Sequence, residues 1–148
     1  MRVNLGAGSI LEPGYVNHDI VALPGIDVIH DLDIAPWPWA DGSLERLRAF
    51  DVFEHVSDPL IFMQESWRVL RRGACLEMHT CYWRSQNAYT DPTHRRFPTM
   101  ETFDYWCAGT YLNQRYGAAY TGGFAVFEKL KVGLDGTELA VLLKKPLA

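Results

Sequence analysis

A glycine turn and an acidic residue near the start of the chain have the types and spacing of a cofactor-binding site. The segment Asn4-Leu5-Gly6-Ala7-Gly8 ends a short apolar stretch, and a second stretch ends in Asp19. Glycines let the backbone approach a ligand without a side chain in the way. A carboxylate can accept hydrogen bonds from both hydroxyls of a ribose. The pattern indicates a nucleotide-type cofactor at the edge of a parallel sheet, although tight turns also need glycine for ordinary reasons.

A second group of reactive side chains, Asp51-x-x-Glu54-His55, follows close behind a predicted strand. Carboxylates and imidazoles bind divalent ions, and a histidine can also act as a general base near neutral pH. The structural alternative is that Glu54 and His55 only cap the turn into the next helix. Asp51 would then lie on a polar face of the sheet.

Short segments of alternating polar and apolar residues must position these groups, and we predict seven strands. The last two flank the glycine-containing turn 133–137, which is typical of an antiparallel hairpin. The predicted strands are Arg2–Leu5, Tyr15–Ile20, Ile26–Asp31, Leu47–Phe53, Cys75–Thr80, Phe124–Val132 and Glu138–Lys144.

One long helix is predicted from Pro59 to about Arg72, with apolar residues at helical spacing. Asp58 is a suitable N-cap, and Gly73 can adopt the left-handed conformation of a C-cap. A shorter helix is predicted between Thr99 and Gly109.

The connections after Gly8 and Ile20 are too short for the helix that usually joins parallel strands. Parallel strands covered on both faces are almost wholly apolar, whereas Glu77 and His79 alternate with Leu76 here. We therefore expect helices on one face of the sheet and a thinly covered opposite face. That open face is predicted to form a homodimer interface or to dock a partner.

Composition limits the remaining classes of protein. A chain of 148 residues is expected to form one domain, 1–148. The net charge of −4 offers no basic surface for nucleic acid, and three cysteines without a Cys-x-x-Cys pair argue against a zinc ribbon. Neither a membrane-spanning apolar run nor a basic leader is visible, so we expect a cytoplasmic protein without a membrane partner.

In their order and spacing, these segments resemble small class I S-adenosylmethionine (SAM)-dependent methyltransferases of the "methyltransferase type 11" kind. The resemblance implies an α/β, Rossmann-like fold in which SAM lies across the carboxyl ends of the first strands of a mostly parallel seven-stranded sheet. The segments that carry it are Val3–Gly8, Val16–Ile20, Val28–Leu32, Phe50–Val56, Val69–Ala74 and Thr90–Phe97.

The same resemblance implies roles for individual residues in binding SAM. The backbone at Gly6–Gly8 and the Asp19 carboxylate would place the methyl donor, and Asp31 with Leu32 would hold the base. Phe53 would line the donor site, and Asp31 could alternatively only cap a loop. The implied cofactor residues are Asn4, Gly6, Ala7, Gly8, Asp19, Asp31, Leu32 and Phe53.

Asp51, Glu54 and His55, together with the later His94, are similar to the divalent-metal site of small-RNA 3′-end 2′-O-methyltransferases. Some quinone-pathway O-methyltransferases carry a similar arrangement. A metal ion there would lower the pKa of an acceptor hydroxyl. Without a metal, His94 or His55 is the candidate general base.

The sequence thus predicts SAM-dependent methylation of a hydroxyl or similar nucleophile on a small molecule or saccharide. The aromatic-rich region 82–124 would form the acceptor pocket, or it packs as core or as a dimer contact. The main alternative is a methyltransferase-fold protein without catalysis that acts by association, which the missing helices favour. An NAD(P)-binding fold is a third possibility, and the short Gly8–Asp19 spacing disfavours it.

Overall fold

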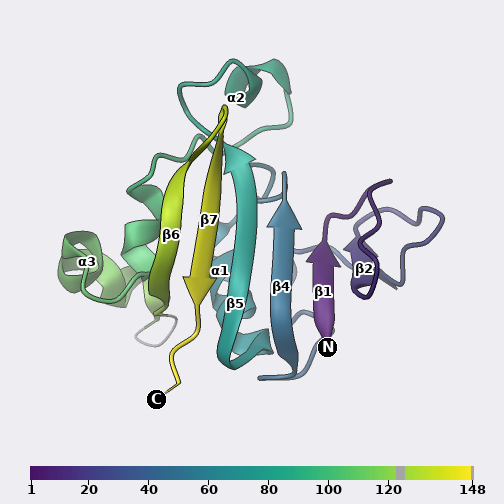
Figure 1. Ribbon diagram of the computed structural model, residues 1–148, viewed down its shortest axis with the longest axis horizontal. Helices are drawn as coiled ribbons and strands as arrows, with labels where there is room; N and C mark the ends of the chain where they lie inside the picture. The colour runs from purple at the N-terminus through teal and green to yellow at the C-terminus, as the bar shows by residue number, and fades with distance from the viewer. Residues whose placement is uncertain (123–125, 148) are drawn as a thin grey trace.

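Seven strands form one sheet in the order β3-β2-β1-β4-β5-β7-β6 (Figure 1). The computed structural model describes residues 1–122 and 126–147. The neighbouring pairs from β3 to β5 are parallel, and β7 lies antiparallel between β5 and β6. The predicted mostly parallel sheet with a C-terminal antiparallel hairpin is therefore confirmed. The strands are β1 (Arg2–Leu5), β2 (Val16–Asp19), β3 (Val28–Ile29), β4 (Leu44–Phe50), β5 (Leu70–Cys81), β6 (Glu128–Asp135) and β7 (Glu138–Lys144).

The longer helices cover one face of this sheet, as expected. Figure 1 shows α1 behind the strands and α3 beside it, and no helix in front of β4, β5 and β7 among the described residues. The connections from β1 to β2 and from β2 to β3 are turns and loops without a helix, as their length predicts. No helix in the described ranges is both long and apolar enough to cross a membrane. The helices are α1 (Pro59–Val69), α2 (Asn87–Thr90), the 3-10 helix η1 (Thr102–Trp106) and α3 (Tyr111–Thr121).

Helix α1 begins where the sequence predicts and ends earlier. The Asp58 carboxylate accepts hydrogen bonds from the backbone N–H groups of residues 60 and 61, as an N-cap does. Leu70, predicted as helical, is already extended because it pairs with Leu44 of β4. Gly73 has a φ of +78°, but it lies inside β5 at an irregularity of the β4–β5 ladder and is not a helix cap.

The observed bounds of several other strands and helices also differ from the predicted ones. The predicted strand 47–53 is β4 (Leu44–Phe50), because Asp51 has a φ of +54° and leaves the strand. The hairpin turn is at Gly136, and Phe124, predicted to begin β6, lies outside the described residues. The predicted helix at 99–109 is the shorter η1, and helices α2 and α3 were not predicted.

The two faces of the sheet differ as the alternation predicts. Leu47, Leu76 and Met78 are fully buried in the core beneath α1. On the other face Arg46 forms an ion pair with Glu77 at 2.5 Å, and both side chains are about one third exposed. The open face is thus polar and free of helices in the described part of the chain.

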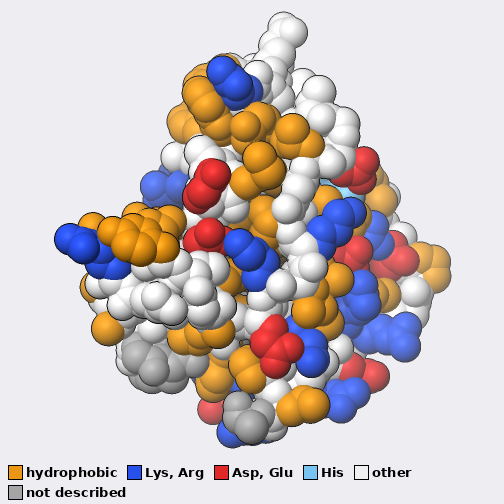
Figure 2. Space-filling model, turned by 60° about the vertical axis from the view of Figure 1, so that its left-hand side comes forward, with side chains coloured by type: hydrophobic (Ala, Val, Ile, Leu, Met, Phe, Trp, Pro, Cys, Tyr) orange, Lys and Arg blue, Asp and Glu red, His pale blue; other side chains and the backbone are white. Residues whose placement is uncertain are grey.

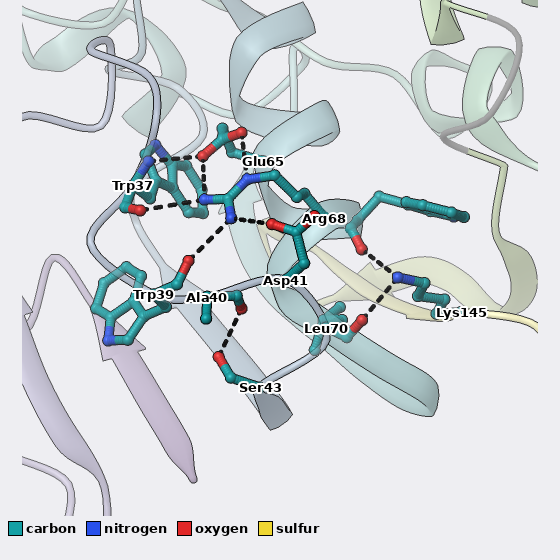
Figure 3. Close-up of polar contacts among 10 residues, drawn as sticks. Trp37, Trp39, Ala40, Asp41, Ser43, Glu65, Arg68, Leu70 and Lys145 are labelled. Atoms are coloured by element: carbon teal, nitrogen blue, oxygen red, sulfur yellow. Dashed lines mark hydrogen bonds and ion pairs between the residues drawn. The ribbon is translucent and has the colours of Figure 1, made fainter.

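A hydrogen-bonded network attaches the long β3–β4 connection to α1 (Figure 3). The Glu65 carboxylate accepts the backbone N–H of Trp37 at 2.6 Å and two hydrogen bonds from Arg68. The Arg68 guanidinium also donates to the carbonyls of Trp37 and Trp39 and to the Asp41 carboxylate. Burial alone would raise the pKa of Glu65, but the hydrogen bonds from Arg68 and Trp37 more than offset it, so the pKa is lowered.

Replacement of Arg68 by Met should lower the free energy of unfolding by about 3 kcal/mol, because the largely buried Glu65 carboxylate loses its cation. We expect Arg72→Met, at an exposed arginine that donates a hydrogen bond to the Leu147 carbonyl, to change it by less than about 0.5 kcal/mol. Urea unfolding of both variants at neutral pH measures the difference. Equal losses in the two variants would show that the network contributes nothing beyond the arginine side chain's own packing.

Candidate functional site

A cavity lies at the carboxyl ends of the parallel strands β1, β2, β3 and β4. This is the edge where open α/β sheets bind ligands. Four aspartates and four apolar side chains contribute to its walls. We call it the first cavity, and it is lined by Gly6, His18, Asp19, Ile20, His30, Asp31, Leu32, Asp33, Asp51, Val52, His55 and Val56.

The glycine turn after β1 is held in a conformation that other residues disfavour. Gly6 has a φ of +59°, and a Cβ atom there would lie 2.5 Å from Cγ2 of Val52. Gly8 has a φ of +52°, with nothing within 4 Å of the place of a Cβ. The Asp19 carboxylate accepts the backbone N–H of Gly8 at 2.8 Å and that of Val21 at 2.9 Å. Asp19 therefore fixes the turn, while each of its oxygens keeps a second lone pair for a ligand.

His18 forms the buried floor of the first cavity. One ring nitrogen, Nε2, lies 3.0 Å from the carbonyl of His30 and must donate to it. The other, Nδ1, accepts the backbone N–H of Gly6 at 3.5 Å. Burial lowers the pKa of His18, although the hydrogen bond to His30 and the nearby Asp19 oppose this. The imidazole is therefore held neutral, with a fixed tautomer.

The predicted cofactor residues separate into two groups. Gly6, Asp19, Asp31 and Leu32 line the first cavity, and Asp31 also caps its loop by accepting the backbone N–H of residue 33 at 3.0 Å. Asn4, Ala7, Gly8 and Phe53 are not among the lining residues.

Two of these four residues have clear structural roles instead. The Asn4 side chain donates to Asn17 Oδ1 and to the Ile10 carbonyl. Phe53 is 1% exposed and packs against Phe62, with ring centroids 5.7 Å apart. The prediction that Phe53 lines the donor site therefore needs correction, because its side chain points into the core. Its neighbour Val52 lines the cavity instead.

A second cavity adjoins the first, and the two share Asp51 and His55. Glu54 lies in its wall but is 1% exposed. Its carboxylate accepts Thr80 Oγ1 at 2.9 Å and the backbone N–H of Cys81 at 3.0 Å, so it holds the chain after Phe53 to β5. The second cavity is lined by Asp51, Glu54, His55, Cys81, Asn87, Thr90, Asp91, Pro92, His94 and Glu138.

His55 and His94 meet in this second cavity, as the sequence predicts, with ring centroids 4.7 Å apart. Their companion is Asp91: one ligand atom from each of the three residues lies within 4.8 Å of the others. Neither Asp51 nor Glu54 joins this set, so the four-residue metal set predicted from the sequence is not assembled as such. Asp91 was missed, although its spacing from His94 in Asp91-Pro92-Thr93-His94 is a weak signal.

Burial, and after it the charge of the nearby Glu54, raise the pKa of the Cys81 thiol to about 11. The thiol in this wall is therefore protonated at neutral pH and is not poised to act as a nucleophile.

The aromatic region after β5 divides between core and surface. Phe103 and Trp106 are buried in the main core. Tyr89 and Phe97 are exposed and stack with centroids 4.8 Å apart, on either side of the Asp91–His94 segment in sequence. Figure 2 shows hydrophobic side chains gathered near the top of the molecule, at the level of α2 in Figure 1.

Comparison with solved structures places this architecture among known folds. A SAM-dependent methyltransferase of Thermotoga maritima, described as a possible histamine N-methyltransferase, is similar with a TM-score of 0.67 and 16% identity over 97% of this chain and 81% of that one. The complex of the Haloferax volcanii Trm112 methyltransferase activator with a putative methyltransferase gives 0.64 and 13%, over 98% and 82%. The [4+2]-cyclase SpnF gives 0.64 and 14%, over 99% and 75%.

The chain has the class I SAM-dependent methyltransferase fold. This agrees with the resemblance seen in the sequence. No protein-family model matches the chain, and no curated protein matches it. At 13–16% identity the likeness establishes the fold alone, so function must be argued from the two cavities.

Gly6→Ala should destabilise the protein more than Gly8→Ala does. Both replacements place a side chain at positive φ, which costs about 1–2 kcal/mol, but only Gly6→Ala drives a Cβ into Val52, for a further ~1–3 kcal/mol. Val52→Ala combined with Gly6→Ala should recover that second part in a double-mutant cycle of urea unfolding. Additive effects of the two replacements would contradict the close approach.

The buried His18 should make stability fall on the acid side of its ordinary pKa of 6.5. Because the folded pKa is lowered, the unfolded chain takes up the proton first. The stabilisation is complete above 6.5 and is lost as the pH falls through the folded value. Urea midpoints measured between about pH 7.5 and 5 should therefore drop less in His18→Gln than in the wild type. An unchanged pH dependence in the variant would rule out a lowered pKa.

Proposed function

We propose that this protein is a SAM-dependent methyltransferase acting on a hydroxyl or similar nucleophile of a small molecule or saccharide. The observation that carries the proposal is the charge of the first cavity, which lies at the ligand-binding edge of the fold. The cavity is lined by four aspartates, Asp19, Asp31, Asp33 and Asp51. Among the described residues, no lysine or arginine lines it.

This lining fits SAM better than a phosphate-containing cofactor. SAM carries a sulfonium and an ammonium group against one carboxylate, so the aspartates attract its net positive charge, whereas they would repel the phosphates of NAD(P). Ile20, Leu32 and Val52 provide apolar walls for a purine ring, the usual composition of a small-molecule site. Gly6 keeps the space against Val52 free of a side chain.

When bound, SAM supplies a methyl group activated by its positively charged sulfur. The protein's tasks are then to position the two reactants and to remove the acceptor's proton. Asp19 would accept hydrogen bonds from the ribose hydroxyls through its remaining lone pairs, and Asp31 and Leu32 would hold the base. The first cavity, at about 270 Å³, is smaller than most ligand sites, so we infer that the methionine end extends toward the shared residues Asp51 and His55.

The acceptor would then occupy the second cavity, where His55 and His94 are the candidate general bases. Hydrogen bonds orient both rings through Nδ1: His94 Nδ1 lies 3.1 Å from the Ala88 carbonyl, and His55 Nδ1 lies 3.0 Å from Thr93 Oγ1. In each neutral ring the Nε2 lone pair remains free to accept a proton. The exposed Tyr89 and Phe97 offer a stacking surface for a planar or sugar-ring acceptor.

A second candidate function is association without catalysis, through the open face of the sheet. The observation in its favour is that this face carries alternating charges, with the ion pair Arg46–Glu77 at its centre and no covering helix in the described ranges. A homodimer in analytical ultracentrifugation that Arg46→Glu dissociates would support it. A monomer that binds SAM would favour the enzyme.

Replacement of Asp19 by Asn should weaken binding of S-adenosylhomocysteine, the demethylated form of SAM, about 10- to 100-fold, because one or two charge-assisted hydrogen bonds are lost. Asp27→Asn is the matched control. The Asp27 carboxylate accepts the backbone N–H of Asn17 at 2.8 Å, as Asp19 accepts those of Gly8 and Val21, but it lies outside the first cavity. Calorimetric titration of both variants tests the assignment. Failure of folded wild-type protein to bind would refute the proposed function.

A further inference from the structure

We propose that His55, Asp91 and His94 form a binding site for a first-row divalent transition-metal ion. This set differs from the one that the sequence predicts, since it includes Asp91 and excludes Asp51 and Glu54. Binding of the ion itself does not depend on the function proposed above. Only its role in methyl transfer does.

The spacing of the three side chains fits a metal ion. Their ligand atoms lie within 4.8 Å of one another. Metal–ligand bonds of about 2.0–2.2 Å in a tetrahedral site place the ligand atoms roughly 3.3–3.6 Å apart, so the side chains must rotate, moving these atoms by about an ångström, to close on an ion. Asp91 is exposed and both histidines are half-buried, which gives an ion access from solvent.

The hydrogen bonds around the set prepare both imidazoles as ligands. The Thr93 hydroxyl donates to Asp91 Oδ1 at 2.7 Å and therefore accepts the Nδ1–H of His55 at 3.0 Å. The Ala88 carbonyl can only accept, so His94 Nδ1, 3.1 Å away, carries a proton. Both Nε2 lone pairs are consequently free. Metal-binding histidines are oriented in this way, with the other ring nitrogen donating to an oxygen.

The surroundings attract a cation. Asp51, Glu54 and Glu138 line the same cavity as Asp91, and no lysine or arginine does in the described part of the chain. Burial raises the pKa of Glu138, and the nearby Asp51 raises it further, which reflects the concentration of negative charge here.

The donor set also selects the kind of ion. Two imidazoles and one carboxylate suit Zn²⁺, Co²⁺, Mn²⁺ or Fe²⁺, whereas Mg²⁺ and Ca²⁺ prefer oxygen ligands. Three protein ligands leave coordination positions open for water or for an acceptor hydroxyl. The cavity is the one in which we place the acceptor, so a bound ion would lower the pKa of that hydroxyl and take over the task of the free histidines.

The test is calorimetric titration of metal-free protein with Zn²⁺ and with Co²⁺, without cofactor or acceptor. We expect one ion per chain, and at least tenfold weaker binding in Asp91→Asn and in His94→Gln. Thr93→Val keeps the side-chain volume and removes the hydroxyl that orients His55, and it should weaken binding about tenfold. Asp135→Asn and His30→Gln, one exposed carboxylate and one imidazole outside the set, are the controls and should bind normally.

One further variant separates this site from the set predicted by the sequence. Asp51→Asn is tolerated by the backbone, because Asn readily adopts the positive φ of residue 51. It should change the affinity by less than about threefold, as expected for a charge that is nearby but not a ligand. Zn²⁺ binding to the wild type should also shift the Nε2 nitrogen resonances of His55 and His94 in NMR spectra and leave that of His18 in place.

Absence of binding, or binding that Asp91→Asn and His94→Gln leave unchanged, would overturn the inference. A loss of affinity in Asp51→Asn with none in Asp91→Asn would assign the ion to the other set and overturn it as well. Titration of the same samples with S-adenosylhomocysteine distinguishes the two proposals. Cofactor binding without metal binding refutes the metal site alone, and metal binding without cofactor binding refutes the methyltransferase alone.

Discussion

The hydrogen bonds between Glu65, Arg68 and the β3–β4 connection hold in place the wall of the first cavity that contains Leu32. No helix connects β1 to β2 or β2 to β3. The core-facing side of these strands must therefore be covered by another part of the chain. The connection after β3 supplies that cover with two tryptophans, Trp37 and Trp39, which are 2% and 6% exposed. Glu65 and Arg68 hold the backbone at these tryptophans against α1.

The two tryptophans in turn contact two residues that line the first cavity, Leu32 and His18. Trp37 Nε1 donates to the carbonyl of Leu32 at 3.0 Å, which fixes a residue of the cavity wall. Trp39 packs edge-on against the His18 ring, with centroids 5.6 Å apart. His18 in turn accepts the N–H of Gly6. No helix directly follows the glycine turn in the described structure, so α1 and the loop attached to it support the first cavity instead.

Carboxylates also position the loops around the two cavities, because they accept hydrogen bonds from backbone N–H groups. Asp33 accepts N–H groups from Ser57 and Asp58 and so joins the loop after β3 to the start of α1. Burial alone would raise the pKa of Asp33, but the hydrogen bonds with Ser57 and Asp58 lower it. The Glu54 carboxylate likewise accepts the Thr80 hydroxyl and the Cys81 N–H, and so joins the β4–α1 loop to β5. Several carboxylates in this protein therefore hold a loop and also line a cavity, as Asp33 and Glu54 do.

The sequence was most informative where local chemistry decides the structure. Strand β7 and the start of α1 at Asp58 follow from alternation and from a capping side chain. Helix α3 escaped prediction because only Gly117 and Thr121 of its residues are buried, so it has no apolar stripe. The early end of β4 depends on the positive φ of Asp51, a conformation that Asp adopts more readily than most residues but that the sequence alone does not require.

The candidate site shows the same division. His55 and His94 were predicted to meet, but Asp91 was not, because its position depends on a contact between distant parts of the chain. The carbonyl of Glu54 accepts the N–H groups of Arg95 at 2.8 Å and Arg96 at 3.1 Å. These bonds bring the segment after α2 against the β4–α1 loop and place Asp91 beside His55. One residue, Glu54, thus assembles the second cavity with its backbone and its side chain, and this explains why it is buried and not available as a ligand.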